Sequence, residues 1–346
     1  MTELLCIGNA IVDMFVSLDS VRMNELGIVH PVQHIGCEQM EKILEELNSR
    51  TGAAAVTSGG GAANVAKISA MLGINAAFAG CVGHDEPAAF FEKELNDAGV
   101  KALLSTGVGK TGRCLICDSG NETRIAASPG AALEITEADV DRALSGGAEA
   151  VVLDGYMLDR RPIVQHILQQ SNKRGIPVAL DAASVFQMLN KTEEILHYSR
   201  NYPLLLFFNA DEAIVFYNVI KHSRNEEINL SDRDKEKIIL DEVCPILKII
   251  TDGEIFPIVV IKLGSRGALV AAGGNIYREE TFSLMSGNTV GAGDAFCAAF
   301  LAAWIRGRPL SKCAELGNRV ARQLLEVPGT MIKSGKLKSF AKNLRK

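Results

Sequence analysis

The sequence predicts an α/β protein whose central sheet is mainly parallel. Two observations favour this fold class. Short, fully apolar segments alternate along most of the chain with longer segments of helical character. Near residues 100–130 this alternation gives way to strands without helices, which indicates a separate small sheet. A chain of 346 residues could form one large domain or two of ordinary size, and we expect a single domain over residues 1–346.

Composition narrows the classes of function. Apolar residues make up 47% of the chain and charged residues 22%, which is typical of a globular protein. The net charge of −5 gives no general attraction for nucleic acid or an anionic membrane, so we expect a small-molecule partner. No basic region precedes the short apolar run near the N-terminus, and no apolar stretch approaches the ~20 residues that cross a bilayer. The sequence therefore predicts a cytoplasmic protein.

The eight cysteines are scattered, and we expect free, mostly buried thiols in a reducing compartment. Only Cys114 and Cys117 have the spacing of metal ligands. Positions i and i+3 of a strand point to opposite faces, so this pair does not predict a zinc site.

The chain opens with a short apolar strand at residues 4–7, a turn at 8–13 and a half-exposed strand at 15–19. Asp13 would then lie near the carboxyl end of a core strand, where open α/β sheets place ligands. A turn aspartate can also be purely structural. A helix is expected at 37–49, where apolar residues recur at helical spacing.

Three glycines at 59–61 run directly into a predicted helix that continues through Leu72. Glycines let a ligand approach the backbone, and Asn64 in the first helical turn can reach such a ligand. A flexible linker is the alternative, but linkers do not run into an alanine-rich helix. A strand with the turn Gly83-His84-Asp85 and a helix at 87–98 complete this β-α-β alternation.

The small sheet is expected to contain strands at 100–104, 113–117 and 123–127 and to pack as a flap over the main sheet. Residues 107–112 fit the pattern G-x-G-x-x-G, but a strand follows them where a dinucleotide site needs a helix. Residues 109–111 resemble the end of a P-loop, yet Leu104 stands where that motif needs glycine.

After residue 131 the alternation resumes. We expect helices at 137–144 and 160–174, and strands at 150–153, 178–181 and 204–208. Asn209 and Glu212 follow the last strand at positions i and i+3, so both project from one side of a helix start. The same pair also fits a capping box. Residues 219–237 are polar and unpatterned, which is typical of a surface insertion.

The C-terminal third is organised around the glycine turn at residues 286–294. A strand, a glycine turn and a second strand are expected at 257–270, with a third strand at 275–279 and helices at 311–326 and 335–345. The apolar run 295–304 contains five alanines and favours helix, which places Gly291 and Gly293 at a helix N-terminus that attracts anions. Asp294 beside a bound phosphate could accept the proton of an attacking hydroxyl, although it could also simply cap the helix.

In this order, the motifs resemble the PfkB/ribokinase family of carbohydrate and nucleoside kinases along nearly the whole chain. The motifs are Gly8-Asn9 with Asp13, Gly59-Gly60 with Asn64, residues 80–85, residues 209–212, Gly264 with Gly267, and residues 291–294. The resemblance implies a three-layer, ribokinase-like α/β core with a mainly parallel sheet and a small β-sheet lid, built from about residues 13–35 and 100–130.

The family pattern also implies roles for individual residues. Asp294 would be the general base, and the turn formed by Gly291, Ala292 and Gly293 would be the anion hole. The acceptor would be held by Asn9, Asp13, Gly60 and Asn64. The ATP site would include Asn209, Lys262, Gly264, Gly267 and Thr289. Asn209 and Glu212 would organise Mg²⁺ through water, which suits an ion that keeps most of its hydration shell.

Within the family, residues 8–13, residues 121–124 and the segment Asp154-Gly155-Tyr156 are most similar to adenosine kinases. The expected reaction is ATP-dependent phosphorylation of the 5′-hydroxyl of a purine nucleoside, and Arg124 on the lid could close over the phosphates. Asn288 replaces the family's usual aspartate, which argues against a monovalent-cation site there. A sugar kinase, a non-catalytic binding protein of the same fold and a nicotinamide oxidoreductase are the alternatives, and either a monomer or a homodimer is compatible with the sequence.

Overall fold

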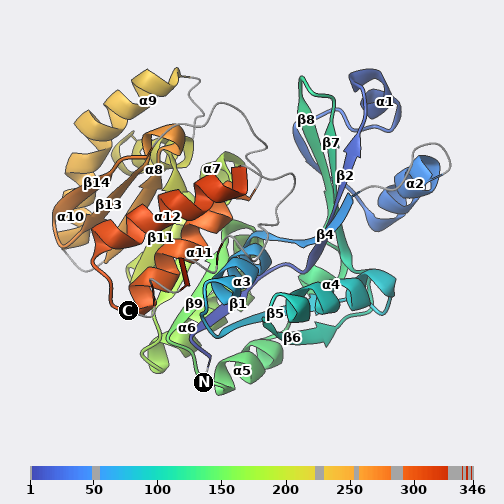
Figure 1. Cartoon of the computed structure of the whole chain (residues 1–346), viewed down its shortest axis with the longest axis horizontal. Coiled ribbons are helices and arrows are strands. Elements are labelled where there is room, and N and C mark those ends of the chain that lie inside the picture. Colours follow the sequence, from blue (N-terminus) through green and yellow to red (C-terminus); the bar gives the residue numbers. More distant parts are fainter. Residues whose placement is uncertain are drawn as a thin grey trace.

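A computed structural model of the chain describes residues 2–48, 55–222, 230–252, 257–281 and 291–325, together with Leu337, Phe340, Ala341 and Leu344. Within these residues the strands form two separate sheets, one of nine strands and one of five. Figure 1 shows the large sheet at the centre of a helical body and the small sheet projecting from it. None of the described helices is long and apolar enough to cross a membrane.

The large sheet has the strand order β14-β13-β12-β11-β10-β9-β1-β5-β6. Its strands are β1 (Leu4–Ile7), β5 (Ala76–Val82), β6 (Lys101–Thr106), β9 (Ala150–Asp154), β10 (Val178–Asp181), β11 (Leu204–Asn209), β12 (Ile258–Lys262), β13 (Ala268–Ala272) and β14 (Asn275–Glu279). Pairing is parallel from β6 to β12, and the hairpin β13–β14 adds two antiparallel strands at one edge. The prediction of a mainly parallel α/β sheet is confirmed.

Helices cover both faces of this sheet, so the body has three layers. One face packs against α3 (Gly61–Met71), α4 (Glu86–Asp97), α11 (Ala292–Ile305) and α12 (Leu310–Leu325). The other packs against α5 (Glu137–Ser145), α6 (Arg161–Lys173), α7 (Val185–Ser199), α8 (Ala210–His222) and α10 (Cys244–Asp252). Consecutive residues of β11 illustrate the arrangement, because Phe207 lies 5.3 Å from the Phe300 ring of α11 and Phe208 lies 5.0 Å from the Phe216 ring of α8.

The small sheet has the order β3-β8-β7-β2-β4. It contains β2 (Ile11–Ser17), β3 (Val32–His34), β4 (Ala55–Gly59), β7 (Gly112–Asp118) and β8 (Thr123–Ser128). Helices α1 (Ser20–Glu25) and α2 (Cys37–Asn48) cover one of its faces with a core that includes Met23, Met40, Leu115 and Ala126. In Figure 1 these two helices lie on the side of the small sheet away from α7 and α12.

The structure corrects two predictions about the small sheet. The strand expected at 100–104 is β6, which pairs in parallel with β5 of the large sheet, because the chain returns to the edge of that sheet after the crossover helix α4. The small sheet instead contains β4, a strand that was not predicted because its residues were interpreted only as the segment before the glycine turn. Asp13 also lies within a strand rather than in a turn, because β4 and β7 pair with β2 on its two sides.

Other differences are local. Helix α7 was not predicted, and the expected insertion at 219–237 includes the end of α8 and a further helix, α9 (Asp232–Ile238), while residues 223–229 lie outside the described residues. Most of the helix expected at 335–345 also lies outside them. The helices and strands expected around the glycine turns agree with α3, α8, α11 and β11–β14 to within a few residues.

Candidate active site

A cavity of about 660 Å³ opens at the carboxyl ends of the parallel strands. Four neighbouring strands, β9 to β12, each end on a polar residue that lines this cavity. These residues are Asp154, Asp181, Asn209 and Lys262. The carboxyl edge of a parallel sheet is where α/β proteins bind their ligands, so the fold places a row of polar groups at the expected edge.

Helix α11 begins at this cavity with the turn that the sequence singled out. Gly291 is the N-cap, with φ 81°, a conformation that glycine adopts without strain. The first helical hydrogen bond runs from Ala295 N to Gly291 O, so the N–H groups of Ala292, Gly293 and Asp294 have no partner within the helix. The prediction of a glycine turn that opens a buried helix is confirmed, and its amides are suited to bind an anion.

Asp294 lies in the first turn of α11 on the cavity wall. Its Oδ2 accepts a hydrogen bond of 2.9 Å from Nδ2 of Asn64, which comes from α3. Burial raises the pKa of Asp294 to about 7, and the nearby carboxylates Asp181 and Asp154 act in the same direction, against the hydrogen bond from Asn64 and the charge of Lys262. A carboxylate with a pKa near neutrality is well suited to accept a proton from an alcohol.

Lys262 lies directly beneath the glycine turn. A Cβ atom added to Gly293 would lie 3.3 Å from Lys262 Nζ, and Nζ forms a 2.6 Å ion pair with Asp181 Oδ2. Burial opposes the charged form of Lys262, but Asp181 and Glu212 outweigh burial and raise its pKa. The lysine therefore supplies a largely buried positive charge beside the amides of α11 that have no partner within the helix.

Asn209 and Glu212 form a capping box, which is one of the two interpretations that the sequence allowed for this pair. Asn209 N donates to Glu212 Oε2 at 2.6 Å, Asn209 Nδ2 donates to Oε1 at 2.8 Å, and Glu212 N donates to Asn209 Oδ1 at 2.9 Å. Both side chains also line the cavity. Burial raises the pKa of Glu212 to about 7. Each carboxylate oxygen of Glu212 keeps a lone pair that a water molecule could use.

The glycines at 59–61 allow close packing between α3 and the strand ends. A Cβ atom at Gly60, where φ is 90°, would overlap the carbonyl oxygen of Asn9. A Cβ at Gly61 would lie 3.4 Å from both Asp154 Cβ and Asp294 Oδ1. The glycine turn thus fits between two carboxylates, and a linker role for it is excluded.

Asn64 and Asp13 are the most buried of the residues predicted to hold an acceptor. Asn64 is 5% exposed, and its Oδ1 has no hydrogen-bond partner among the described residues, so this part of the site offers an acceptor atom next to Asp294. Asp13 is 7% exposed, and burial raises its pKa to about 7 against the effects of Lys67 and Cys114. Gly59 leaves the space that the Asp13 carboxylate occupies. Asn9 differs, because its Oδ1 accepts a 2.6 Å hydrogen bond from Arg160.

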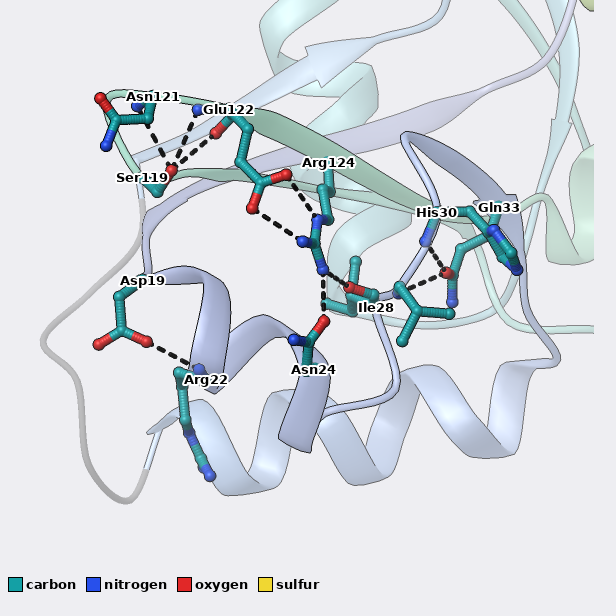
Figure 2. A network of polar contacts seen from close by, with 11 residues as sticks. Asp19, Arg22, Asn24, Ile28, His30, Gln33, Ser119, Asn121, Glu122 and Arg124 are labelled. Carbon is teal, nitrogen blue, oxygen red and sulfur yellow. Dashed lines mark hydrogen bonds and ion pairs between the residues drawn. The ribbon is translucent and has the colours of Figure 1, made fainter.

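Arg124 does not lie where its predicted role requires. Figure 2 shows its guanidinium directed toward α1, where it donates to Asn24 Oδ1 at 2.6 Å and to the carbonyl of Ile28 at 2.8 Å. Glu122 forms a 2.8 Å ion pair with the same group. Arg124 is paired in register with Cys117, which packs against α1 and α2. The arginine therefore belongs to the covered face of the small sheet and is not directed at the phosphates.

The remaining predicted nucleotide residues divide into two groups. Gly264 and Gly267 line the cavity, with φ 60° and 87°, and a Cβ at Gly267 would overlap the carbonyl oxygen of Glu279. Thr289, and Asn288 on which the monovalent-cation prediction depends, lie outside the described residues.

Asp154 and Asp181 are cavity residues to which sequence reasoning gave no role. Asp154 is 4% exposed, and its carboxylate accepts hydrogen bonds from Tyr156 N at 3.1 Å and Ala62 N at 3.3 Å. Each aspartate is the final residue of an apolar strand, and this was the signal that could have identified both. The G-x-G-x-x-G pattern has a structural explanation, because Glu134 accepts hydrogen bonds from Val108 N and Gly109 N at 2.7 and 2.8 Å.

Comparisons with known proteins agree with this geometry. The family model described as pfkB family carbohydrate kinase matches residues 32–336. An adenosine kinase of Dictyostelium discoideum is 21% identical over 345 residues, which cover 95% of this chain and 96% of that protein. An ATP-dependent ribose-1-phosphate kinase of Halopiger xanaduensis is 26% identical over 266 residues, with coverage of 76% and 78%. The crystal structure of adenosine kinase from Sinorhizobium meliloti has a TM-score of 0.81 at 25% identity and covers 99% of this chain and 98% of its own.

The comparisons confirm the resemblance inferred from the order of the motifs and the ribokinase-like fold. The similar proteins include kinases of nucleosides and of sugar phosphates, so the comparisons do not identify the acceptor of this kinase. The family model extends over most of the sequence, from the third strand to beyond α12. The chain belongs to the pfkB family of carbohydrate kinases, and it is an ATP-dependent kinase.

Proposed function

We propose that this kinase transfers the γ-phosphoryl group of ATP to the 5′-hydroxyl of a purine nucleoside, with adenosine as the first candidate. The observation that carries the proposal is the group of carboxylates around the glycine turn at 59–61. Asp13, Asp154 and Asp294 gather around the glycine turn at 59–61, and all three are buried or line the cavity wall. Such a site favours a neutral molecule that donates hydroxyl hydrogen bonds to carboxylates.

The cations near this site already donate hydrogen bonds to the protein, although Nε of Arg160 has no partner among the described residues. Among the described residues, Lys67 donates to Ser58, Arg160 donates to Asn9 and to the carbonyl of Ala132, and Arg124 is bonded on the far face of the small sheet. A sugar phosphate would bring a dianion next to several carboxylates, which is electrostatically unfavourable. This argues against a phosphorylated acceptor and leaves nucleosides and free sugars.

A nucleoside is favoured over a free sugar by the apolar surface next to Asp13. Phe15 lies two residues beyond Asp13 on β2, on the same face of the small sheet, and is paired in register with Ile116 of β7. Met14 and Val16 point to the opposite face, toward α1 and α2. An aromatic and a branched apolar side chain next to a hydroxyl-binding carboxylate suit a base attached to a ribose. The similarity to adenosine kinases along nearly the full length of both chains supports the same choice.

In the proposed reaction, Asp294 accepts the proton of the 5′-hydroxyl while the hydroxyl oxygen forms a bond to the γ-phosphorus of ATP. The bond between the γ-phosphorus and the bridging oxygen breaks, and ADP leaves with that oxygen. The N–H groups of Ala292 and Gly293 and the charge of Lys262 stabilise the transferred group. Asn64 orients Asp294 through the 2.9 Å hydrogen bond.

The residues present fit a hydrated Mg²⁺. Asn209 and Glu212 line the cavity, and Glu212 retains lone pairs after it has bonded Asn209. They would hold the ion through water, as Mg²⁺ prefers. When bound, the ion would neutralise charge on the phosphates of ATP.

A coupled assay of ADP release with Mg-ATP tests the proposal. The acceptors are adenosine, inosine, guanosine, ribose, fructose, ribose 1-phosphate and fructose 6-phosphate. Each acceptor is also assayed with the Asp294→Asn variant, which serves as the negative control. We expect turnover with adenosine that the variant lacks. Turnover with ribose or fructose alone would assign a sugar kinase, the second candidate, and turnover with only the phosphorylated sugars would refute the electrostatic argument.

A further inference from the structure

Lys67 is a buried charge that the phosphoryl-transfer chemistry described above does not use. It lies in α3, only 1% exposed, and its Nζ donates hydrogen bonds to the carbonyl oxygen of Ser58 and, at 2.9 Å, to Ser58 Oγ. Burial lowers its pKa to about 8. Removing an ammonium group from water costs several kcal/mol unless hydrogen bonds and opposite charges compensate, so this lysine requires a specific environment.

Ser58 is held from two helices of the large body. Lys67 reaches it from α3, and Glu94 of α4 accepts hydrogen bonds through Oε2 from Ser58 N at 3.0 Å and Ser58 Oγ at 3.3 Å. Thr57 Oγ1 also donates to the same oxygen at 3.2 Å. Thr57 and Ser58 lie near the end of β4, the strand of the small sheet that leads into the glycine turn. The polar cluster therefore fixes the small sheet to α3 and α4 at the point where the acceptor turn begins.

Four titratable groups surround Lys67 and interact with it directly or through a neighbour. Asp13 approaches from β2, Glu94 from α4 and Asp294 from α11, and all three favour the charged form of the lysine. Cys114 of β7 contacts Asp13 from the next strand. Burial favours protonation of Asp13, and the charge of Lys67 is the first influence that opposes it.

We propose that Lys67 is a positioning residue for the acceptor, whose buried ammonium fixes the start of the glycine turn through Ser58 and favours the ionised form of Asp13, which receives an acceptor hydroxyl. The inference rests on the proposed function in taking Asp13 as part of the acceptor site. It does not depend on whether that acceptor is a nucleoside or a free sugar. A side chain that only filled space would affect the site equally at every pH, whereas a charge that favours ionisation of Asp13 acts most strongly at and below the pKa of Asp13.

The test is Lys67→Met, which keeps the length of the side chain and removes its charge. Kinetics are measured at pH 6.5 and 8.5 with the neutral acceptor that the unmodified enzyme uses. We expect the KM for the acceptor to rise about 10-fold at pH 6.5, with the KM for ATP changed by less than about 2-fold. The rise should be several-fold larger at pH 6.5 than at pH 8.5, because Asp13 without Lys67 stays protonated to higher pH. An equal rise at both pH values, or none, would overturn the proposal.

Lys191→Met is the matched control. Lys191 is a partly exposed lysine whose Nζ lies 3.0 Å from Asp159 Oδ1, and neither residue lines the cavity. It should leave both KM values and their pH dependence unchanged. Glu94→Gln removes a negative charge that favours the charged form of Lys67 and should therefore raise the acceptor KM, in the same direction as Lys67→Met. An unchanged or lowered acceptor KM would contradict the charge argument, and this variant serves if the methionine variant does not fold.

A thermal-unfolding series separates failure of this inference from failure of the proposed function, because it needs no acceptor. The pKa of Asp13 is raised on folding, so its ionisation destabilises the folded state progressively as the pH rises from about 4 to about 7. Without Lys67 this loss is larger and extends to higher pH. The unmodified protein also regains stability as Lys67, whose pKa is lowered to about 8, loses its proton, so both effects act in the same direction. The Tm of Lys67→Met should therefore fall relative to that of the unmodified protein by about 2 °C between pH 6.5 and 8.5. A difference in Tm that stays constant would refute the role of Lys67 even if no acceptor were found.

Discussion

Replacement of Asp294 by asparagine should inactivate the enzyme and at the same time stabilise its fold. The substitution keeps the size of the side chain, and the amide oxygen of asparagine can still accept the hydrogen bond from Asn64 Nδ2. It removes a carboxylate that burial and two neighbouring carboxylates hold in an unfavourable environment. Function and stability therefore respond to this change in opposite directions.

Both magnitudes follow from the environment of Asp294. A general base contributes roughly 10²- to 10⁴-fold to the rate, and we expect kcat to fall by about that factor. The pKa rises from an ordinary value of 3.8 to about 7. Each pH unit corresponds to about 1.4 kcal/mol, so full ionisation costs the folded state at most about 4 kcal/mol. Because Asp294 lies on a solvent-accessible cavity wall, we expect about 1–3 kcal/mol of this cost to be recovered in the variant.

The sign of the pH dependence follows from the same pKa. A carboxyl group whose pKa is raised on folding costs progressively more stability as the pH rises from about 4 to about 7, and the cost is constant above that range. Urea unfolding of both proteins at pH 5 and pH 8 should therefore give a larger gain for Asp294→Asn at pH 8. In the unmodified enzyme, kcat should fall about tenfold per pH unit below pH 7. A variant that keeps kcat within about tenfold, or that is less stable at pH 8, would refute the assignment.

Two further substitutions test the outer parts of the site. Arg124→Ala should lower the free energy of unfolding by about 1–3 kcal/mol, because Asn24 and the Ile28 carbonyl lose their donor, and it should leave the KM for ATP unchanged. A tenfold rise in that KM would instead place the guanidinium at the phosphates. Gly267→Ala should cost about 2–4 kcal/mol and abolish the thermal stabilisation by ATP, since the new Cβ would overlap a backbone carbonyl. Gly273→Ala, at φ 52° with open space around it, is the control for backbone strain alone.

The features that the sequence predicted well are local ones. The turn at Gly291–Asp294 and its helix follow from glycine conformation and helix propensity within about fifteen residues, and the capping box of Asn209 and Glu212 needs only four. The apolar strands β9 to β12 are recognisable because both of their faces are buried. Consistency between local pattern and global fold made these elements predictable.

The errors concern contacts between distant parts of the chain. The pairing of β6 with β5 depends on the path of a crossover helix, which the composition of residues 101–106 does not reveal. Arg124 is bonded to residues almost 100 positions away, so its direction follows from the packing of α1 on the small sheet. Asp154 and Asp181 were overlooked because an aspartate after an apolar strand is also a common turn residue. Only the side-by-side alignment of β9 and β10 brings the two together.

The row of strand-terminal residues has an evolutionary consequence. Each of the four strands β9 to β12 ends on one polar residue directly after its buried interior, namely Asp154, Asp181, Asn209 and Lys262. Replacing such a residue alters the chemistry at the cavity, while the packed segment of the strand before it is retained. Neighbouring strands are separated by about 4.8 Å, which sets the spacing between these positions independently of the residues that occupy them. The chemistry of the cavity can therefore change by exchanges along this edge. Asp181 and Lys262 would have to change together, because either one alone would leave an unpaired charge that is largely removed from water. Insertions within the strands would reverse the face of every following side chain and are expected to be selected against.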